Sequence, residues 1–334
     1  MPSLSHTLLR LSVENMRRAV STEAQNIQSL RQLLDLSSSA LYLPRGVQAE
    51  AFEIGDFKAE WLTPKEADPE RVILFLHGGG YAVGSITTHR ALAGKLAKMA
   101  GCRALIIDYR LAPEHPFPAA LEDAVKAYRY LLSESFSPTH IVLAGDSAGG
   151  GLCMSLQLCL KELKMPLPAG AVLFSPWVDL SFSGQSVQEH QKTDPVVIAQ
   201  HVKEWATGYA QAFPLNHPMI SPLYGDLSGL SPVLIQASDA EVLTDDAMRL
   251  ARALAAAHTP SHLQLYPGLL HVWQLFWRYV PEANEALEHA ATFLRKQIDH
   301  AIERDNHDAE EPRPRQAQEI PLMKPGTSGF RVAV

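Results

Sequence analysis

The sequence predicts an α/β protein with a mostly parallel sheet that is covered by helices on both faces. From Arg71 onward, short apolar runs alternate with longer amphipathic segments. The first of these runs, Val72–Leu76, is continuously apolar, which is typical of a parallel strand buried on both faces. A Gly-x-Ser-x-Gly pentapeptide follows a later strand-like run and passes directly into a helix-compatible segment. Strands that alternate with helices in this way form one sheet between helical layers.

Hydrophobic periodicity assigns each element in turn. Two amphipathic helices are predicted within residues 4–36, and the strand-like runs Ala49–Ile54 and Lys58–Leu62 are close enough in the chain to pair as a hairpin. The later strands are predicted at Val72–Leu76, Arg103–Ile107, Ile141–Ala144, Ala171–Phe174, Val233–Ala237 and His262–Tyr266. The later helices are predicted at Thr88–Ala100, Ala119–Leu132, Leu152–Leu163, Thr244–Ala257 and Glu282–Ile298.

Departures from this alternation define the domain organisation. Residues 1–40 precede the core strands, and we predict that they form cap helices or a dimerisation arm. Residues 41–303 form the core, with a helical cap insert at about 180–215, where polar and aromatic residues interrupt the pattern. Residues 304–334 carry four prolines, many charges and little periodicity, so we predict a disordered tail.

Composition narrows the function classes. A chain of 334 residues that is 46% hydrophobic can bury a large core, and its formal net charge of −7 disfavours a nucleic-acid or anionic-membrane surface. The odd number of cysteines, Cys102, Cys153 and Cys159, favours reduced thiols. We find no signal peptide, no run of membrane-spanning length and no spacing typical of a metal site. We therefore expect a soluble cytoplasmic protein with no metal and no cofactor.

The pentapeptide is Gly145-Asp146-Ser147-Ala148-Gly149, and it directly follows Ile141–Ala144. A serine on a sharp strand-to-helix turn projects from the end of the sheet, and the flanking glycines let the backbone make that turn. Ser147 is therefore the candidate nucleophile. The alternative is a glycine-rich connection whose serine only caps the following helix.

A second loop, His77-Gly78-Gly79-Gly80-Tyr81, begins where the strand ending at Leu76 stops. Consecutive glycines leave backbone N–H groups unobstructed, as an oxyanion hole requires, although a flexible turn explains them equally well. Ligands of open α/β sheets bind at the carboxyl ends of the strands, where Ser147 is also expected. This shared position favours the oxyanion-hole interpretation.

His271 is the candidate general base among fourteen histidines. It lies in a loop just beyond the last predicted strand, His262–Tyr266, and downstream of both the serine and the acidic segment. The chain order Ser, acid, His is that of an α/β-hydrolase triad. His77 is the alternative, but its place beside the glycines suits a role in shaping that loop.

Four carboxylates follow the strand Val233–Ala237 and compete for the role of the acid: Asp239, Glu241, Asp245 and Asp246. Asp245 and Asp246 follow Thr244, a good N-cap, and are sufficiently explained as first-turn charges that complement the helix dipole. Asp239 and Glu241 lie in the connecting loop, from which a carboxylate could reach a histidine. The residues alone leave these two open.

Three motifs in order resemble the hormone-sensitive-lipase family of α/β-hydrolases, the bacterial family IV esterases. They are His77-Gly-Gly-Gly-Tyr, Asp108-Tyr-Arg-Leu-Ala-Pro-Glu-His-Pro-Phe-Pro-Ala-Ala and Gly145-Asp-Ser-Ala-Gly, and the similarity runs from roughly Arg31 to Ile298. The resemblance implies a triad of Ser147, Glu241 and His271, in which Glu241 stands where the family usually has Asp. It also implies a cap built from the N-terminal helices and the insert. The oxyanion hole that it implies uses the N–H groups of Gly78, Gly79 and Ala148.

We therefore expect a serine carboxylesterase that hydrolyses short- to medium-chain acyl esters through an acyl-enzyme. Its expected partner is a small-molecule ester, with no nucleic acid and no stable membrane association, and a homodimer is left open. The alternatives are hydrolysis of an amide, a lactone or an N-acyl arylamine by the same residues, and a non-catalytic receptor of the same fold, which the presence of His271 disfavours. The aromatic residues of the insert could line a pocket, but packing of the cap is favoured for them: Trp205, Tyr209 and Phe213.

Overall fold

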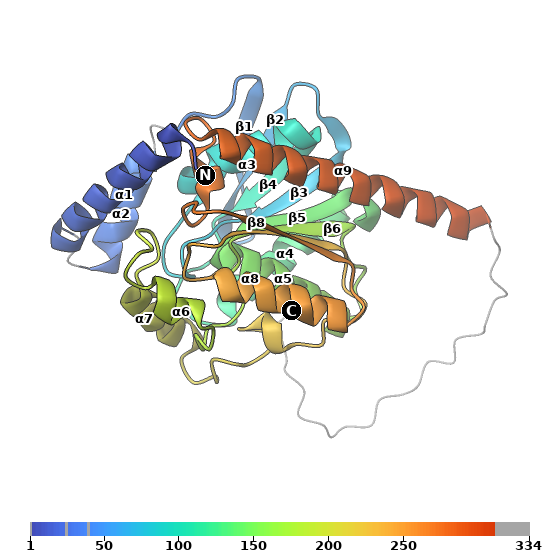
Figure 1. The fold of residues 1–334 in the computed structure, drawn as a ribbon. Helices are drawn as coiled ribbons and strands as arrows, with labels where there is room; N and C mark the ends of the chain where they lie inside the picture. The colour runs from blue at the N-terminus through green and yellow to red at the C-terminus, as the bar shows by residue number, and fades with distance from the viewer. Residues whose placement is uncertain (1, 24–25, 39–40, 311–334) are drawn as a thin grey trace.

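The computed structural model describes residues 2–23, 26–38 and 41–310, and its centre is an eight-stranded sheet (Figure 1). The strand order is β1-β2-β4-β3-β5-β6-β7-β8. The strands are β1 (Val47–Ile54), β2 (Phe57–Pro64), β3 (Asp68–Leu76), β4 (Cys102–Ile107), β5 (Ile141–Asp146), β6 (Gly170–Phe174), β7 (Val233–Ser238) and β8 (Ser261–Tyr266). β1 and β2 form the predicted antiparallel hairpin, and β2 also pairs antiparallel with β4. All the other neighbouring strands are parallel.

Helices cover both faces of this sheet. α3 (Ile86–Ala100) and α9 (Pro281–Glu310) lie on one face, and α4 (Ala119–Ser133), α5 (Ala148–Glu162) and α8 (Thr244–Ala256) lie on the other (Figure 1). Each face has its own hydrophobic core. Ile73 and Phe75 of β3 belong to the core beneath α3 and α9, whereas Val72 and Leu74 belong to the core beneath α4, α5 and α8. The predicted fold class, a mostly parallel sheet between helical layers, is confirmed.

The sheet order reverses at β3. β4 lies on one side of β3 and β5 lies on the other, although β4 and β5 follow β3 in turn along the chain. Such a switch point is where open α/β sheets bind ligands, beyond the carboxyl ends of the strands. The register pairs Leu76 with Gly145, so the predicted glycine loop and serine loop leave the sheet side by side. The topology therefore brings the two motifs together.

The predicted cap elements gather on one side of the molecule (Figure 1). They are α1 (Leu4–Glu23), α2 (Ile27–Ser38), α6 (Ser186–His190) and α7 (Ala199–Ala210). Arg31 fastens α2, because its guanidinium donates to the carbonyl oxygens of Ala82 and Ala112 at 2.8 Å and pairs with Glu114. The described residues also contain the 3₁₀ turns η1 (Pro138–His140), η2 (Pro222–Tyr224) and η3 (Trp273–Phe276). Within the described ranges, no helix has both the length and the apolar character that a membrane span requires.

Helix α9 is longer than the sequence predicts. The periodicity places its end at Ile298, before a tail that starts at residue 304, but the helix continues to Glu310. A helix that is already nucleated adds residues at small cost, so polar residues can extend it without a core. The prediction of a disordered tail is therefore wrong for residues 304–310. Residues 311–334, the rest of that predicted tail, lie outside the described residues.

Candidate active site

Ser147 lies in the sharp turn between β5 and α5. Its φ of 50° and ψ of −121° are dihedral angles that few residues other than glycine adopt. Its side chain makes no capping hydrogen bond to α5, so the interpretation of this serine as a helix cap is wrong. The carbonyl oxygen of Phe174 accepts its N–H at 2.8 Å and ties the turn to the end of β6. The residue is partly exposed between buried neighbours, as a nucleophile must be.

Glycines let this turn pack directly against the end of β3. A Cβ atom on Gly149 would lie 2.0 Å from the carbonyl oxygen of Leu76 and 2.5 Å from that of His77. A Cβ atom on Gly145 would lie 2.5 Å from the carbonyl oxygen of Gly149. These distances exclude any side chain, so both positions need glycine. The first turn of α5 therefore lies against the start of the glycine loop.

Glu241 and His271 meet beyond the ends of β7 and β8. His271 Nδ1 lies 2.6 Å from Glu241 Oε2, and both side chains are buried. The other carboxylate oxygen of Glu241 accepts the N–H of Ser238 at 2.9 Å, which fixes the carboxylate on its own loop. Val272, directly after His271, donates its N–H to Ser175 Oγ at 3.2 Å. Because Ser175 follows β6, the histidine loop is attached to the strand end that also holds the serine turn.

Two of the competing carboxylates have other partners. Asp239 is exposed, and it accepts the N–H of Gly268 at 2.7 Å. Asp245 accepts the N–H of Ser186 at 2.9 Å. Each therefore fixes a loop backbone, and the carboxylate of Glu241 is the one that contacts the imidazole.

The environment of His271 raises its pKa above the ordinary value. Burial lowers this pKa, but the hydrogen bond to Glu241 and the negative charge of Glu241 outweigh burial, and the charges of Asp194 and Asp146 add to the increase. An imidazole held in this way can accept a proton from a hydroxyl, while the carboxylate stabilises the imidazolium that forms.

One of the three predicted oxyanion donors already has a hydrogen-bond partner in the structure. The N–H of Gly78 donates to Asp146 Oδ1 at 3.1 Å, so it already has an acceptor. Within the described part of the chain, the N–H groups of Gly79, Gly80 and Ala148 have no hydrogen-bond acceptor. Gly78 is therefore disfavoured as an oxyanion donor, and the N–H of Gly80, which the sequence does not single out, becomes a candidate beside those of Gly79 and Ala148.

His77 shapes the glycine loop. Its Nδ1–H donates to the carbonyl oxygen of Gly78 at 2.8 Å, and its ring stacks on Tyr109 with the ring centroids 4.2 Å apart. The hydroxyl of Tyr109 in turn donates to the carbonyl oxygen of His77 at 2.7 Å. Burial lowers the pKa of His77 to about 3, so the imidazole is neutral at ordinary pH. A buried, neutral and stacked ring is a poor candidate for the general base.

Two buried carboxylates at this site are not predicted from the sequence. Asp146 contacts Gly78 and, through Oδ2, also lies 3.1 Å from His89 Nε2 of α3. Asp194 of the insert accepts the N–H of Val242, the residue after Glu241, at 3.0 Å. Their partners lie 48 to 68 positions away in the sequence, so local patterns carry no signal for these contacts.

Asp246 has a larger role than that of a first-turn charge. It is buried, and its Oδ2 accepts the N–H groups of Val178 and Asp179 at 2.9 and 2.8 Å. Burial and the charge of Asp179 raise the pKa of Asp246 to about 8. The predicted N-cap is also wrong, because Leu243 precedes α8 and Thr244 is its first residue. The hydroxyl of Thr244 instead donates to two carbonyl oxygens of the acid loop.

Aromatic residues join the cap insert to the glycine loop. Tyr209 of α7 is buried and stacks on Tyr81, with the ring centroids 3.9 Å apart and the planes 5° apart. Phe213 packs edge-on against Phe117, with the ring centroids 5.0 Å apart. Trp205 is half-buried and covers Gly80, since a Cβ atom on Gly80 would lie 2.4 Å from its six-membered ring. Of Trp205, Tyr209 and Phe213, Trp205 is thus the residue that lies directly over Gly80.

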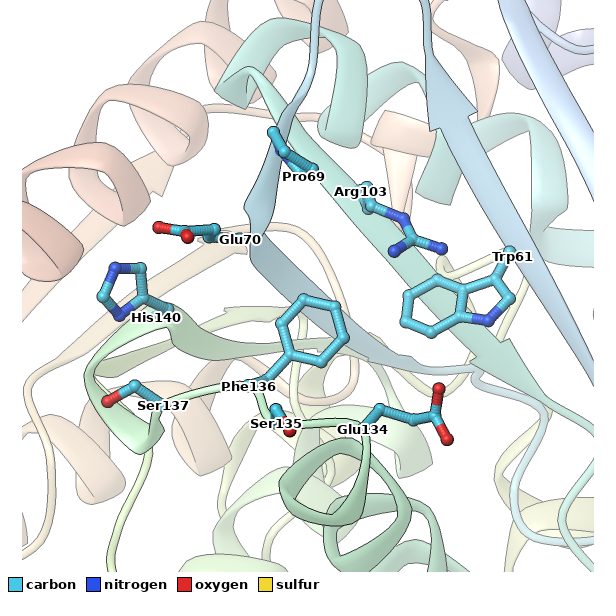
Figure 2. Close-up of a pocket in the computed structure, with 9 residues that line it drawn as sticks. All are labelled: Trp61, Pro69, Glu70, Arg103, Glu134, Ser135, Phe136, Ser137 and His140. Carbon is cyan, nitrogen blue, oxygen red and sulfur yellow. The ribbon is translucent and has the colours of Figure 1, made fainter.

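A separate cavity of about 410 Å³ lies near the amino ends of the strands (Figure 2). Pro69 and Glu70 lie near the start of β3, Arg103 lies near the start of β4, and the guanidinium of Arg103 lies 3.9 Å from the ring centroid of Trp61. No candidate catalytic residue lines this cavity, so it is distinct from the site at the carboxyl edge. Across residues 2–23, 26–38 and 41–310, no cluster of His, Cys, Asp or Glu could hold a metal ion.

Comparison with known proteins agrees with this architecture. Residues 73–275 match a family described as having an alpha/beta hydrolase fold. An acetyl-hydrolase of Streptomyces hygroscopicus is 43% identical over 242 residues, which are 72% of this chain and 81% of that protein. An ethyl acetate hydrolase of Pseudomonas putida is 31% identical over 236 residues, 67% of this chain and 73% of that protein.

A solved esterase from the bacterial hormone-sensitive lipase family is 38% identical, with a TM-score of 0.85 over 89% of this chain and 100% of that one. The chain therefore belongs to the α/β-hydrolase family and, within it, to the bacterial hormone-sensitive-lipase family.

The contact between Glu241 and His271 predicts the effect of Glu241→Gln on activity. The substitution keeps the shape but removes the charge that stabilises the imidazolium, so ester hydrolysis should fall by at least about a hundredfold. The low-pH inflection of kcat/KM should also move to lower pH, because the interactions that raise the pKa of His271 are lost while burial, which lowers it, remains. Asp239→Asn is the control and should lose less than about tenfold. A crippled Asp239→Asn beside an active Glu241→Gln would contradict this assignment.

The contacts of Asp246 predict a loss of stability in Asp246→Ala. Two buried N–H groups would lose their acceptor, which should lower the free energy of unfolding by roughly 2–4 kcal/mol. Asp246→Asn retains an acceptor oxygen and serves as the matched control. A raised pKa makes the folded state bind the extra proton, so the contribution of Asp246 to stability declines as pH rises from the ordinary aspartate pKa to about 8. Urea unfolding should therefore show the free energy of unfolding of Asp246→Asn increasing relative to that of wild type as pH rises through this window. A difference between the two proteins that does not change with pH would count against the raised pKa.

Proposed function

We propose that this protein is a serine carboxylesterase. The observation that carries the proposal is the buried contact of 2.6 Å between Glu241 and His271. It lies at the edge of the sheet where the strained turn presents Ser147. The esterases and acetyl-hydrolases to which the chain is similar support the same activity. The proposed oxyanion donors are the N–H groups of Gly79, Gly80 and Ala148.

In the proposed mechanism, Ser147 Oγ attacks the acyl carbon while His271 Nε2 takes the hydroxyl proton. Nε2 is the nitrogen that remains for this task because Nδ1 contacts Glu241. Backbone N–H groups of the glycine loop and of Ala148 bind the oxygen that becomes negative. The alcohol leaves with the proton from His271, and an acyl-enzyme is formed. A water molecule activated by the same imidazole then releases the acid.

We further propose that the substrates are esters with short to medium acyl chains. Trp205 covers the glycine loop and thereby restricts the space beside the proposed oxyanion donors. Two relatives, named for hydrolysis of acetyl groups and of ethyl acetate, favour the short end of this range. The same residues could also attack other acyl groups, but no contact among the residues that the structure describes favours an amide or a lactone.

The role of Ser147 can be tested by covalent labelling. A fluorophosphonate should label Ser147 alone, because attack requires a hydroxyl that a neighbouring base activates. Ser147→Ala should keep the melting temperature and lose hydrolysis of p-nitrophenyl acetate, whereas Ser133→Ala, at the exposed end of α4, should behave as wild type. Labelling at a different residue, or full activity in Ser147→Ala, would contradict the proposed nucleophile.

The position of Trp205 predicts a change in chain-length preference. Trp205→Ala should raise the kcat/KM ratio of p-nitrophenyl octanoate to acetate by roughly tenfold, because removing the ring makes room for additional methylenes. Lys203→Ala, on the exposed side of the same helix, is the control and should leave this ratio unchanged. An unchanged ratio in Trp205→Ala would show that the acyl chain does not lie beneath this ring.

A further inference from the structure

The N-terminal end of α1 is fastened beside residues 267–272, the histidine loop. The backbone N–H and the hydroxyl of Ser3 donate to the two carboxylate oxygens of Glu282, at the start of α9, over 2.6 and 2.9 Å. Leu9 packs on the small hydrophobic cluster that contains Leu269 and Trp273. These contacts hold the first turns of α1 against the loop that carries the candidate general base.

His6 is the residue of α1 that binds this loop directly. Its exposed fraction is 1%, and its Nε2 accepts the N–H of Leu270 at 3.0 Å. Leu270 is the residue immediately before His271. A ring nitrogen that accepts a hydrogen bond must have a free lone pair, so His6 is neutral here and carries its proton on Nδ1.

Side chains from two other elements therefore hold the backbone on both sides of His271. His6 binds the N–H that precedes it, and Ser175 binds the N–H of Val272 that follows it. Val272 is β-branched and has a φ of 51°, a conformation that costs free energy and persists only where the surroundings enforce it. The strained loop needs such anchors, and α1 supplies one of them.

We propose that His6 is a positioning residue for His271. By accepting the N–H of Leu270, it fixes the backbone from which the catalytic imidazole projects toward Glu241. The proposal rests on the proposed esterase function, since it takes His271 to be the general base. His6 acts through the loop and does not touch the substrate.

Protonation of His6 removes this anchor, because an imidazolium has no lone pair with which to accept the N–H. Burial lowers the pKa of His6, Glu282 of α9 opposes this effect, and Arg10 of the same helix adds to it. The histidine loop presents one titratable side chain, His271, whose own pKa is raised. As pH falls, His271 is therefore protonated first and His6 second, so activity is lost in two steps.

Two variants of the full chain separate an anchoring role from simple packing. His6→Leu removes the acceptor, whereas His6→Gln offers an amide oxygen near the position of Nε2 and cannot titrate. With p-nitrophenyl acetate, His6→Leu should lower kcat roughly tenfold and change KM less than about twofold, as expected when a buried N–H loses its acceptor. His6→Gln should restore most of kcat and give a shallower low-pH limb of kcat/KM. Leu8→Gln, at an exposed position of the same helix, is the control and should match wild type.

The proposal is overturned if His6→Leu keeps the wild-type kcat, if His6→Gln loses as much as His6→Leu, or if the low-pH limb of His6→Gln is as steep as that of wild type. Should His6→Leu fail to fold, as judged by circular dichroism, the kcat and low-pH limb of His6→Gln decide the question. Fluorophosphonate labelling separates this proposal from the one on which it rests. A wild-type protein that is not labelled at Ser147 contradicts the esterase function. Labelling of His6→Leu at the wild-type rate contradicts only the role of His6.

Discussion

The close approach of α5 to the end of β3 is the constraint on which the site depends. Gly149 lies so near the carbonyl oxygens of Leu76 and His77 that no side chain fits between them. This approach places the serine turn and the glycine loop side by side, and the parallel pairing of β3 with β5 sets their common origin. Sheet register and glycine packing thus arrange the proposed nucleophile and the proposed oxyanion donors.

Most of the fold follows from the sequence because its elements are local. The apolar runs that become β3 to β7 are buried, and alternation with amphipathic helices is enough to order them along the chain. The strand order across the sheet needs pairings that no local window contains. The end of α9 could not be predicted either, because residues 304–310 lack apolar periodicity and extend a helix that the preceding residues nucleate.

The candidate site was predicted less completely. Ser147 and His271 are identified by strand-end position and chain order, and Glu241 by a family resemblance that its contact with His271 supports. Gly78 and Asp246 each have a hydrogen-bond partner far away in the sequence, which local patterns do not reveal. Asp146 occupies the N–H of Gly78, and Asp246 binds backbone N–H groups 67 and 68 residues away. Local composition explains such residues as flexible turns or helix charges because it cannot show their partners.

The bond between His6 and Leu270 joins positions that are 264 residues apart. A contact of such separation closes a loop that contains most of the chain, which costs conformational entropy. This cost is offset only when the intervening sheet has formed. Because α1 precedes β8 along the chain, it is synthesised long before the loop that it contacts. Refolding should therefore restore secondary structure before it restores the geometry of the histidine loop, so the catalytic edge of this protein matures late.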